Sequence, residues 1–278
     1  MSAQFKRYSQ LSLFSLAANG LLLLVLGLLW QRDGAVSEVA LASFSGASMQ
    51  LLAKTPIPSD VGQQHKLNYQ QWVDLLGQEA AVIADKRPEN LAILLGDSIT
   101  LWFSKDYLPG NYTWLNQGIS GENTVGLLRR LNLLDTTQPQ VIYVMIGIND
   151  ILRGTGDETI LANHRLIVSH LKRSHPRSRI VLQSILPHSA EQATWEGRDR
   201  LLKIPNQRIR NLNRQLEAIA KNEQIYFLDL YPLFADAQGN LKIELSTDGL
   251  HLNGEGYKVW STALQIFNQV THQRTAGR

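Results

Sequence analysis

The chain has 278 residues, of which 44% are hydrophobic and 18% charged, with a net charge of +3 and no cysteine. This composition excludes a disordered chain, and the lack of cysteine excludes disulfides, thiolate chemistry and cysteine-based zinc sites. The interleaved aromatic and basic pattern of nucleic-acid binders is missing, so no nucleic-acid partner is expected. The length, without an evident repeat, favours one domain with an appendage.

The amino-terminal segment predicts a membrane anchor. Residues 1–10 carry Lys6 and Arg7, and residues 11–30 contain no charge. Twenty helical residues span about 30 Å, the thickness of a bilayer core. The alternative is a cleaved signal peptide, but the nearest small-residue cleavage site lies well beyond this segment, at residues 40–42. The positive charges place residues 1–10 in the cytoplasm and the rest on the extracytoplasmic side, periplasmic or exterior, or secreted if cleavage occurs.

The remainder divides by composition into a linker, a domain and a short tail. Residues 31–64 are rich in Ser, Ala, Gly and Pro without a sustained period, which is typical of a linker. We expect the folded domain to cover residues 65–272, leaving 273–278 as a tail. It begins with an amphipathic helix through Tyr69 and Ala80.

Apolar runs alternate with helical patterns along the domain. The runs that predict buried strands are Leu91–Gly96, Thr113–Gly118, Val141–Gly147, Ile180–Ile185 and Ile225–Leu230. Helical periodicity separates them and continues after the last one, through Leu127–Leu131, Ile160–Leu171, Ile209–Ile219 and Val259–Phe267. Strands joined by helices pair in parallel through right-handed crossovers, so the sequence predicts a doubly wound α/β domain with about five strands.

Polar residues end the first strand abruptly, in the order Gly96, Asp97, Ser98. In open α/β sheets, ligands and catalytic groups gather beyond the carboxyl edge of the strands. We therefore hypothesise that Ser98 is a nucleophile, with Asp97 bonded to neighbouring backbone amides. The alternative is ordinary turn chemistry, in which the serine is the N-cap of the next helix.

A base for this serine is found near the carboxyl end of the chain. Asp248 and His251 are three residues apart in a Gly-rich stretch after the last strand. One helical turn would place both side chains on one face, where the carboxylate can orient the imidazole. The alternatives are that Asp248 is a turn residue and that His251 is a polar group near the surface. Asn253 can cap the helix that follows.

Two further positions can stabilise an oxyanion. Gly121 lies in the loop after the second predicted strand, where its backbone amide is not obstructed by a side chain. Asn149 follows the third strand and offers a side-chain NH₂ donor. With Ser98 and His251, these donors would complete a site for nucleophilic acyl transfer.

Four motif blocks now occur in order: GDSIT at 96–100, NQGISGENT at 116–124, GIND at 147–150 and DGLHL at 248–252. This set resembles the SGNH (GDSL-like) hydrolase family, in the branch similar to platelet-activating-factor acetylhydrolases and lysophospholipase-like esterases. One departure is that Ile99 stands where many members have leucine.

The resemblance implies a flavodoxin-like three-layer α/β/α sandwich and assigns a role to each matched position. Ser98 matches the nucleophile, His251 the base and Asp248 the acid that orients it. Gly121 and Asn149 match the oxyanion donors, together with the Ser98 amide. Asp97 and Asp150 are supporting residues of the matched blocks. Neither a metal nor another cofactor is implied.

The function expected is hydrolysis of carboxylic esters, of the lipid or acetylated glycan class, through an acyl-enzyme intermediate. One alternative is an acyltransferase with the same residues, and another is a non-catalytic, membrane-tethered binding module. Trp102, Phe103 and Trp195 are candidates for an apolar acyl site, with core packing as the alternative. The sequence leaves the oligomeric state and the natural ester open.

A basic patch lies late in the chain and comprises Arg198, Arg200, Lys203, Arg208, Arg210 and Arg214. It predicts a solvated helix face, with attraction to an anionic membrane or substrate as the alternative.

Overall fold

The computed structural model of the protein describes residues 67–276. Their centre is a five-stranded parallel sheet with the strand order β2-β1-β3-β4-β5. The strands are β1 (Leu91–Gly96), β2 (Thr113–Gly118), β3 (Val141–Met145), β4 (Arg179–Gln183) and β5 (Tyr226–Leu228). This is the strand order of flavodoxin-like folds, whose ligand site lies where the order reverses, between β1 and β3.

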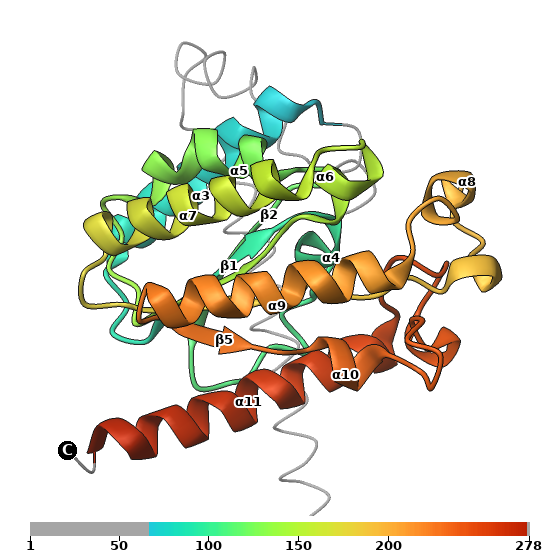
Figure 1. The fold of residues 1–278 in the computed structure, drawn as a ribbon. Coiled ribbons are helices and arrows are strands. Elements are labelled where there is room, and N and C mark those ends of the chain that lie inside the picture. Colours follow the sequence, from blue (N-terminus) through green and yellow to red (C-terminus); the bar gives the residue numbers. More distant parts are fainter. Residues whose placement is uncertain (1–66, 277–278) are drawn as a thin grey trace, which may run out of the picture. The chain divides into compact units, whose positions relative to one another are not determined.

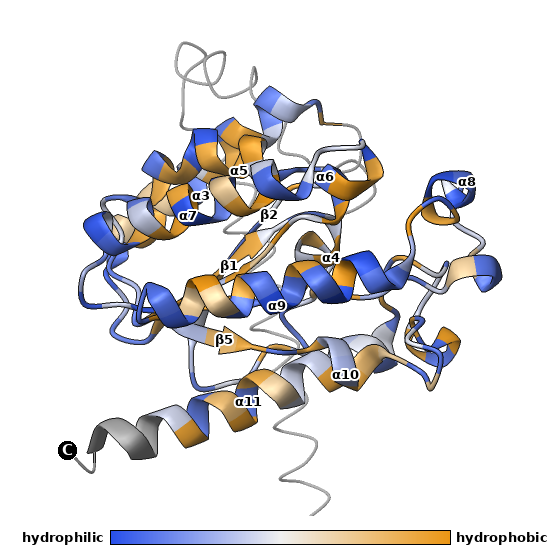
Figure 2. Cartoon of the chain, in the orientation of Figure 1, coloured by the Kyte–Doolittle hydropathy of each residue, from blue (hydrophilic) through white to orange (hydrophobic). Residues whose placement is uncertain are grey.

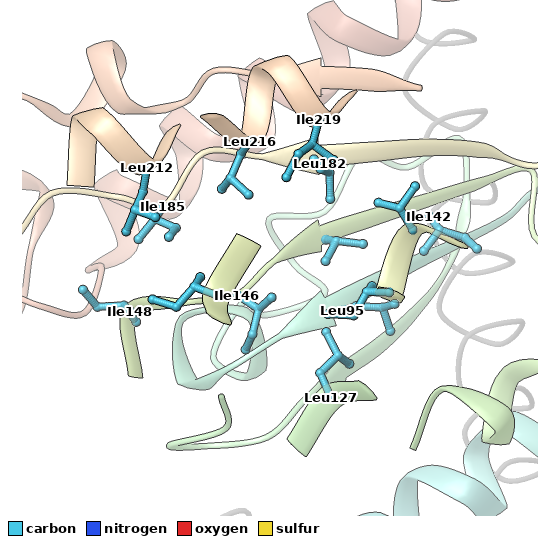
Figure 3. Packing of buried hydrophobic residues seen from close by; sticks show 14 of the residues in the cluster. Leu95, Leu127, Ile142, Ile146, Ile148, Leu182, Ile185, Leu212, Leu216 and Ile219 are labelled. Atoms are coloured by element: carbon cyan, nitrogen blue, oxygen red, sulfur yellow. The ribbon is translucent and has the colours of Figure 1, made fainter. Parts of the chain in front are cut away.

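Four helices cover one face of the sheet (Figure 1). They are α3 (Tyr69–Lys86), α5 (Thr124–Arg130), α7 (Asp157–Ser174) and α9 (Asn206–Asn222). Alternate strand residues such as Leu95, Ile142 and Leu182 pack against apolar side chains of these helices, including Leu127 and Leu216 (Figure 3). Fully burying each such side chain contributes about 2 kcal/mol, so this layer fixes the positions of the helices.

The opposite face packs against α11 (Gly254–Ala276), with α4 (Ser98–Leu101) and α10 (Tyr231–Phe234). Here Tyr143 of β3 and Trp260 of α11 are completely buried. Hydrophilic residues cover the outer side of α9 and most of α8 (Arg198–Leu201) (Figure 2). The three layers confirm the predicted α/β/α sandwich.

The structure differs from the predicted elements at the ends of two strands. β3 ends at Met145, because Gly147 has φ +132° and the chain enters the short helix α6 (Ile148–Leu152). β5 is only three residues long and pairs with β4 alone, as an edge strand. The remaining elements are the 3₁₀ helices η2 (Leu131–Leu134), η3 (Ala190–Gln192) and η4 (Ile243–Leu245).

The predicted anchor at residues 11–30 and the predicted linker at 31–64 lie outside the described residues. Within residues 67–276, no helix combines the length and apolar character needed to cross a bilayer. At the other end, α11 continues to Ala276, beyond the predicted end of the domain at residue 272.

Candidate active site

Ser98 lies directly after β1, as the first residue of α4. The N-cap of α4 is Asp97, whose Oδ1 accepts the Ile99 amide at 3.0 Å. The alternative that Ser98 caps the helix is therefore wrong, and its hydroxyl is available for another partner. The tight turn requires Gly96, because a Cβ there would lie 2.1 Å from Thr100 Oγ1.

The structure brings Ser98 together with His251 and Asp248. Ser98 Oγ lies 3.0 Å from His251 Nε2, and His251 Nδ1 lies 2.7 Å from Asp248 Oδ2. Ser98 and His251 are only 6% and 7% exposed, so water competes little for these bonds. An ionised Asp248 accepts a hydrogen bond from the Nδ1–H group, which leaves Nε2 as the acceptor for the serine hydroxyl.

The charge of Asp248 is stabilised by its hydrogen bonds. Burial acts to raise its pKa, but the backbone amide and ring of His251 and the Leu250 amide outweigh that effect. The net result is a pKa below the ordinary value. The carboxylate is therefore ionised near neutral pH, as an orienting group for the imidazole must be.

A tight turn, and not a helical turn, sets the spacing of Asp248 and His251. Oδ1 of Asp248 accepts the amides of Leu250 and His251 at 2.9 and 2.8 Å. Gly249 has φ +87°, a conformation that L side chains rarely adopt. The predicted proximity is confirmed, while the helical geometry behind the prediction is wrong. Asn253 caps α11 as predicted, by accepting the Gly256 amide at 3.0 Å.

The two predicted oxyanion donors, Gly121 in the loop after β2 and Asn149 in α6, line one cavity with Ser98 and His251. This active-site cavity has a volume of about 570 Å³. Asn149 Nδ2 donates one of its two hydrogens to the Glu122 carbonyl, at 3.1 Å. The second hydrogen of this NH₂ group remains for another acceptor. Across residues 67–276, the backbone amides of Ser98 and Gly121 donate to no protein acceptor. Three N–H groups at this cavity are thus uncommitted.

Asp150 holds α6 and the loop of Gly121 together. Its buried carboxylate accepts the Thr124 amide at 2.8 Å and the Thr124 hydroxyl at 2.5 Å. Because Asp150 follows Asn149 and Thr124 ends the loop of Gly121, these bonds couple the positions of both donors. A buried Glu122–Arg130 ion pair anchors the same loop, with Arg130 also donating to the Gln117 carbonyl at 2.7 Å.

Asp97 is the other supporting acid, and its environment is unusual. Burial, with a smaller effect of the Glu122 and Asp150 carboxylates, raises its pKa to about 7. In the unfolded chain the group has an ordinary pKa near 3.8. The folded state therefore binds the proton more tightly, so stability from this group is lost as pH rises toward 7.

We expect Asp97→Asn to remove this pH dependence. Asparagine keeps an oxygen to accept the Ile99 amide but carries no charge to desolvate. Between pH 5 and 8 the variant should gain about 3 kcal/mol of unfolding free energy relative to the wild type. Urea denaturation of both proteins at several pH values measures this difference. Parallel stability curves over that range would contradict the prediction.

Sequence reasoning missed residues that hold the serine in place. Asn116 donates from Nδ2 to the Thr100 carbonyl at 2.7 Å and accepts the Gly118 amide at 3.0 Å. Tyr257 donates its hydroxyl to the Ile99 carbonyl at 2.8 Å. Asn116 begins one of the four motif blocks, which was the available indication of its importance.

Of the three aromatic candidates, Trp102 and Trp195 line the cavity. The centroid of the Trp102 ring lies 4.3 Å from the centroid of the His251 ring. Phe103 is a core residue, 2% exposed and packed on Trp260. Within the described part of the chain, no cluster of three or more His, Asp or Glu side chains is placed to hold a metal ion.

The profile of the family described as GDSL-like Lipase/Acylhydrolase matches residues 94–259, more than half of the chain. The chain belongs to the GDSL-like lipase/acylhydrolase family. The predicted family resemblance is thereby confirmed, and members of this family are ester hydrolases. All four motif blocks lie within the matched residues.

Solved structures resemble this GDSL-like acylhydrolase over most of their length. A candidate platelet activating factor from Streptococcus pneumonia is 27% identical, with a TM-score of 0.64 over 72% of this chain and 94% of that one. A GDSL-like lipase from Bacteroides thetaiotaomicron shares the fold at 23% identity, with a TM-score of 0.59 over 73% and 98% of the two chains.

A curated relative is the N-acylneuraminate cytidylyltransferase of Streptococcus agalactiae, 27% identical over 175 residues. The match covers 63% of this acylhydrolase but only 38% of that relative. The likeness thus concerns a part of that longer protein.

Proposed function

We propose that the protein hydrolyses carboxylic esters through an acyl-enzyme formed on Ser98. The observation that carries this proposal is the hydrogen-bonded chain from Ser98 through His251 to Asp248. As Oγ attacks the ester carbonyl carbon, its proton passes to His251 Nε2. Asp248 stabilises the imidazolium that forms and keeps the ring in the required tautomer.

The negative charge that develops on the carbonyl oxygen would be bound by three donors. These are the amides of Ser98 and Gly121 and the free hydrogen of the Asn149 side chain. His251 then protonates the departing alcohol oxygen as the C–O bond breaks. A water, deprotonated by the same imidazole, attacks the acyl-enzyme and releases the acid and the free serine.

The class of ester proposed is a lipid or an acetylated glycan. The cavity walls combine indole rings with polar groups, which suits either a short acyl group on a sugar or a small lipid ester. The name of the cytidylyltransferase relative points to a sugar acid, although only part of that protein is matched. The uncharged segment at residues 11–30 supports a further proposal, that the domain acts tethered to a membrane on its extracytoplasmic side.

Labelling with a fluorophosphonate tests the nucleophile directly. We expect one covalent adduct at Ser98, located by peptide mass spectrometry, and turnover of p-nitrophenyl acetate that the reagent abolishes. A non-catalytic binding module would show neither. Product analysis with sugar and glycerol acceptors separates hydrolysis from acyl transfer, because a transferase forms a new ester where a hydrolase forms free acid.

We expect Asn149→Ala to lower kcat/KM for p-nitrophenyl acetate by about 10²- to 10³-fold, with most of the loss in kcat. The side chain bonds the oxyanion, which forms only in the transition state, so substrate binding changes little. Steady-state kinetics measure the effect. A drop confined to KM would contradict a role in charge stabilisation.

A further inference from the structure

Two arginines line the active-site cavity, and both come from segments outside the four motif blocks. Arg153 follows α6, and Arg200 lies in α8, within the basic patch. Both side chains are exposed, while Ser98 and His251 in the same cavity are buried. The cavity therefore combines a buried reaction centre with guanidinium groups that water reaches.

Arg153 is held beside the proposed oxyanion loop. Its Nη2 donates to the Gly121 carbonyl at 2.5 Å. Within residues 67–276 it forms no ion pair with a carboxylate. A guanidinium has five N–H donors, so one bond to a carbonyl leaves the others for a ligand.

Arg200 is held by stacking. Its Cζ lies 4.9 Å from the centroid of the Trp195 ring, a cation–π arrangement. Gly197 makes room for the pair, because a Cβ there would lie 2.3 Å from the indole and 2.7 Å from an Arg200 nitrogen. No carboxylate in the described chain pairs with Arg200 either. Stacking places the guanidinium while leaving its hydrogen-bond donors free.

Two carboxylates also line the cavity and must be counted. Asp248 has its oxygens committed to the His251 ring and to two backbone amides. Glu196 is exposed and is the remaining acidic side chain in the lining. The cavity lining thus has one carboxylate and two guanidiniums that form no ion pair within the described chain, which favours an anion in its outer part.

Resting on the proposed esterase function, we propose that the substrates are anionic esters whose alcohol part carries a carboxylate or a phosphate. Arg153 and Arg200 bind this group. The acyl carbon must reach the buried Ser98 hydroxyl, and the alcohol must depart toward solvent. An anion on the alcohol part therefore meets the two exposed guanidiniums. Of the six residues in the basic patch, only Arg200 lines the cavity, so the predicted attraction of an anionic substrate is assigned to Arg200 alone.

Matched pairs of esters test the proposal on the full chain. One pair is an O-acetylated glucuronic acid and the same acetate of glucose, and the other is acetylglycerol phosphate and acetylglycerol. We expect the anionic member of at least one pair to have a kcat/KM at least about tenfold higher at low ionic strength. The pair that shows the preference identifies the anion as a sugar carboxylate or a phosphate. The preference for the anionic ester should shrink in 0.5 M salt.

Variants of opposite charge sharpen the test. Arg200→Gln and Arg153→Gln should each lower the anionic-to-neutral ratio by about fivefold, because the lost guanidinium contacts the anionic ester and not the neutral one. For Arg200→Gln the change should lie mainly in KM, since the anionic group takes no part in the reaction. Glu196→Gln should raise that ratio. Arg214→Gln is the matched control, since it removes an exposed positive charge that does not line the cavity. Its ratio should equal that of the wild type.

The outcomes separate this proposal from the esterase function itself. Hydrolysis of the neutral esters without any preference for the anionic ones overturns the proposal and leaves the esterase function standing. A ratio that Arg200→Gln and Arg214→Gln lower equally also overturns it, because net charge alone would then explain the effect. Failure to hydrolyse every ester, together with no fluorophosphonate adduct, would refute the esterase function.

Discussion

Ser98→Ala is expected to lower kcat/KM for p-nitrophenyl acetate by on the order of 10⁵- to 10⁶-fold, or to the uncatalysed rate. Without Oγ no acyl-enzyme forms, and His251 has no hydroxyl to deprotonate. The folded state should change little. One buried hydrogen bond is lost and His251 Nε2 loses its partner, so the free energy of unfolding should fall by about 1 to 2 kcal/mol.

Ser120→Ala provides a matched control for that variant. Ser120 lines the same cavity, is exposed and lies next to Gly121, yet it forms no hydrogen bond with the described chain. We expect it to keep activity within about threefold of the wild type, since exposed substitutions away from special features change energies by about 0.5 kcal/mol. Fluorophosphonate should label Ser120→Ala and not Ser98→Ala. Equal activity of the two variants would remove Ser98 from the mechanism.

Most of the sheet could be predicted because buried parallel strands are continuous apolar runs. Leu91–Gly96 and Thr113–Gly118 form strands with the predicted bounds. The predicted strand Ile225–Leu230 is shorter in the structure, where it covers Tyr226–Leu228 and pairs with β4 alone. The bend after Met145 depends on the positive φ of Gly147, a conformation that apolar periodicity does not report.

The sheet topology predicted that the site residues lie close together, but it did not predict the hydrogen bonds that hold them in place. Strand ends meet at one edge of a parallel sheet, which placed Ser98 and Asn149 together. The hydrogen bonds from Asn116 to Thr100 and from Thr124 to Asp150 join residues 16 and 26 positions apart, so no local sequence spacing predicts them. Arg153 and Arg200 lie outside the motif blocks, and only the folded chain brings them to the cavity of Ser98.

Asp248→Asn is expected to lower kcat for p-nitrophenyl acetate by about 10⁴-fold while preserving the fold. The asparagine Oδ1 can still accept the Leu250 and His251 amides, so the turn persists. Its NH₂ group then occupies the place of Oδ2 and points a donor at His251 Nδ1. The imidazole must accept there, which moves its proton to Nε2 and leaves no acceptor for the Ser98 hydroxyl.

The position of the His251 ring proton distinguishes a change of tautomer from simple loss of the Asp248 charge. In the wild type, ¹⁵N NMR of labelled histidine should report the His251 proton on Nδ1, and in Asp248→Asn on Nε2. Urea denaturation should show little change in the free energy of unfolding, since both backbone bonds of the turn remain. If the proton stays on Nδ1 while activity falls, the carboxylate acts only by stabilising the imidazolium. A ring in the wrong tautomer cannot deprotonate the serine. If the variant keeps more than a tenth of the wild-type activity, Asp248 therefore does not orient the base.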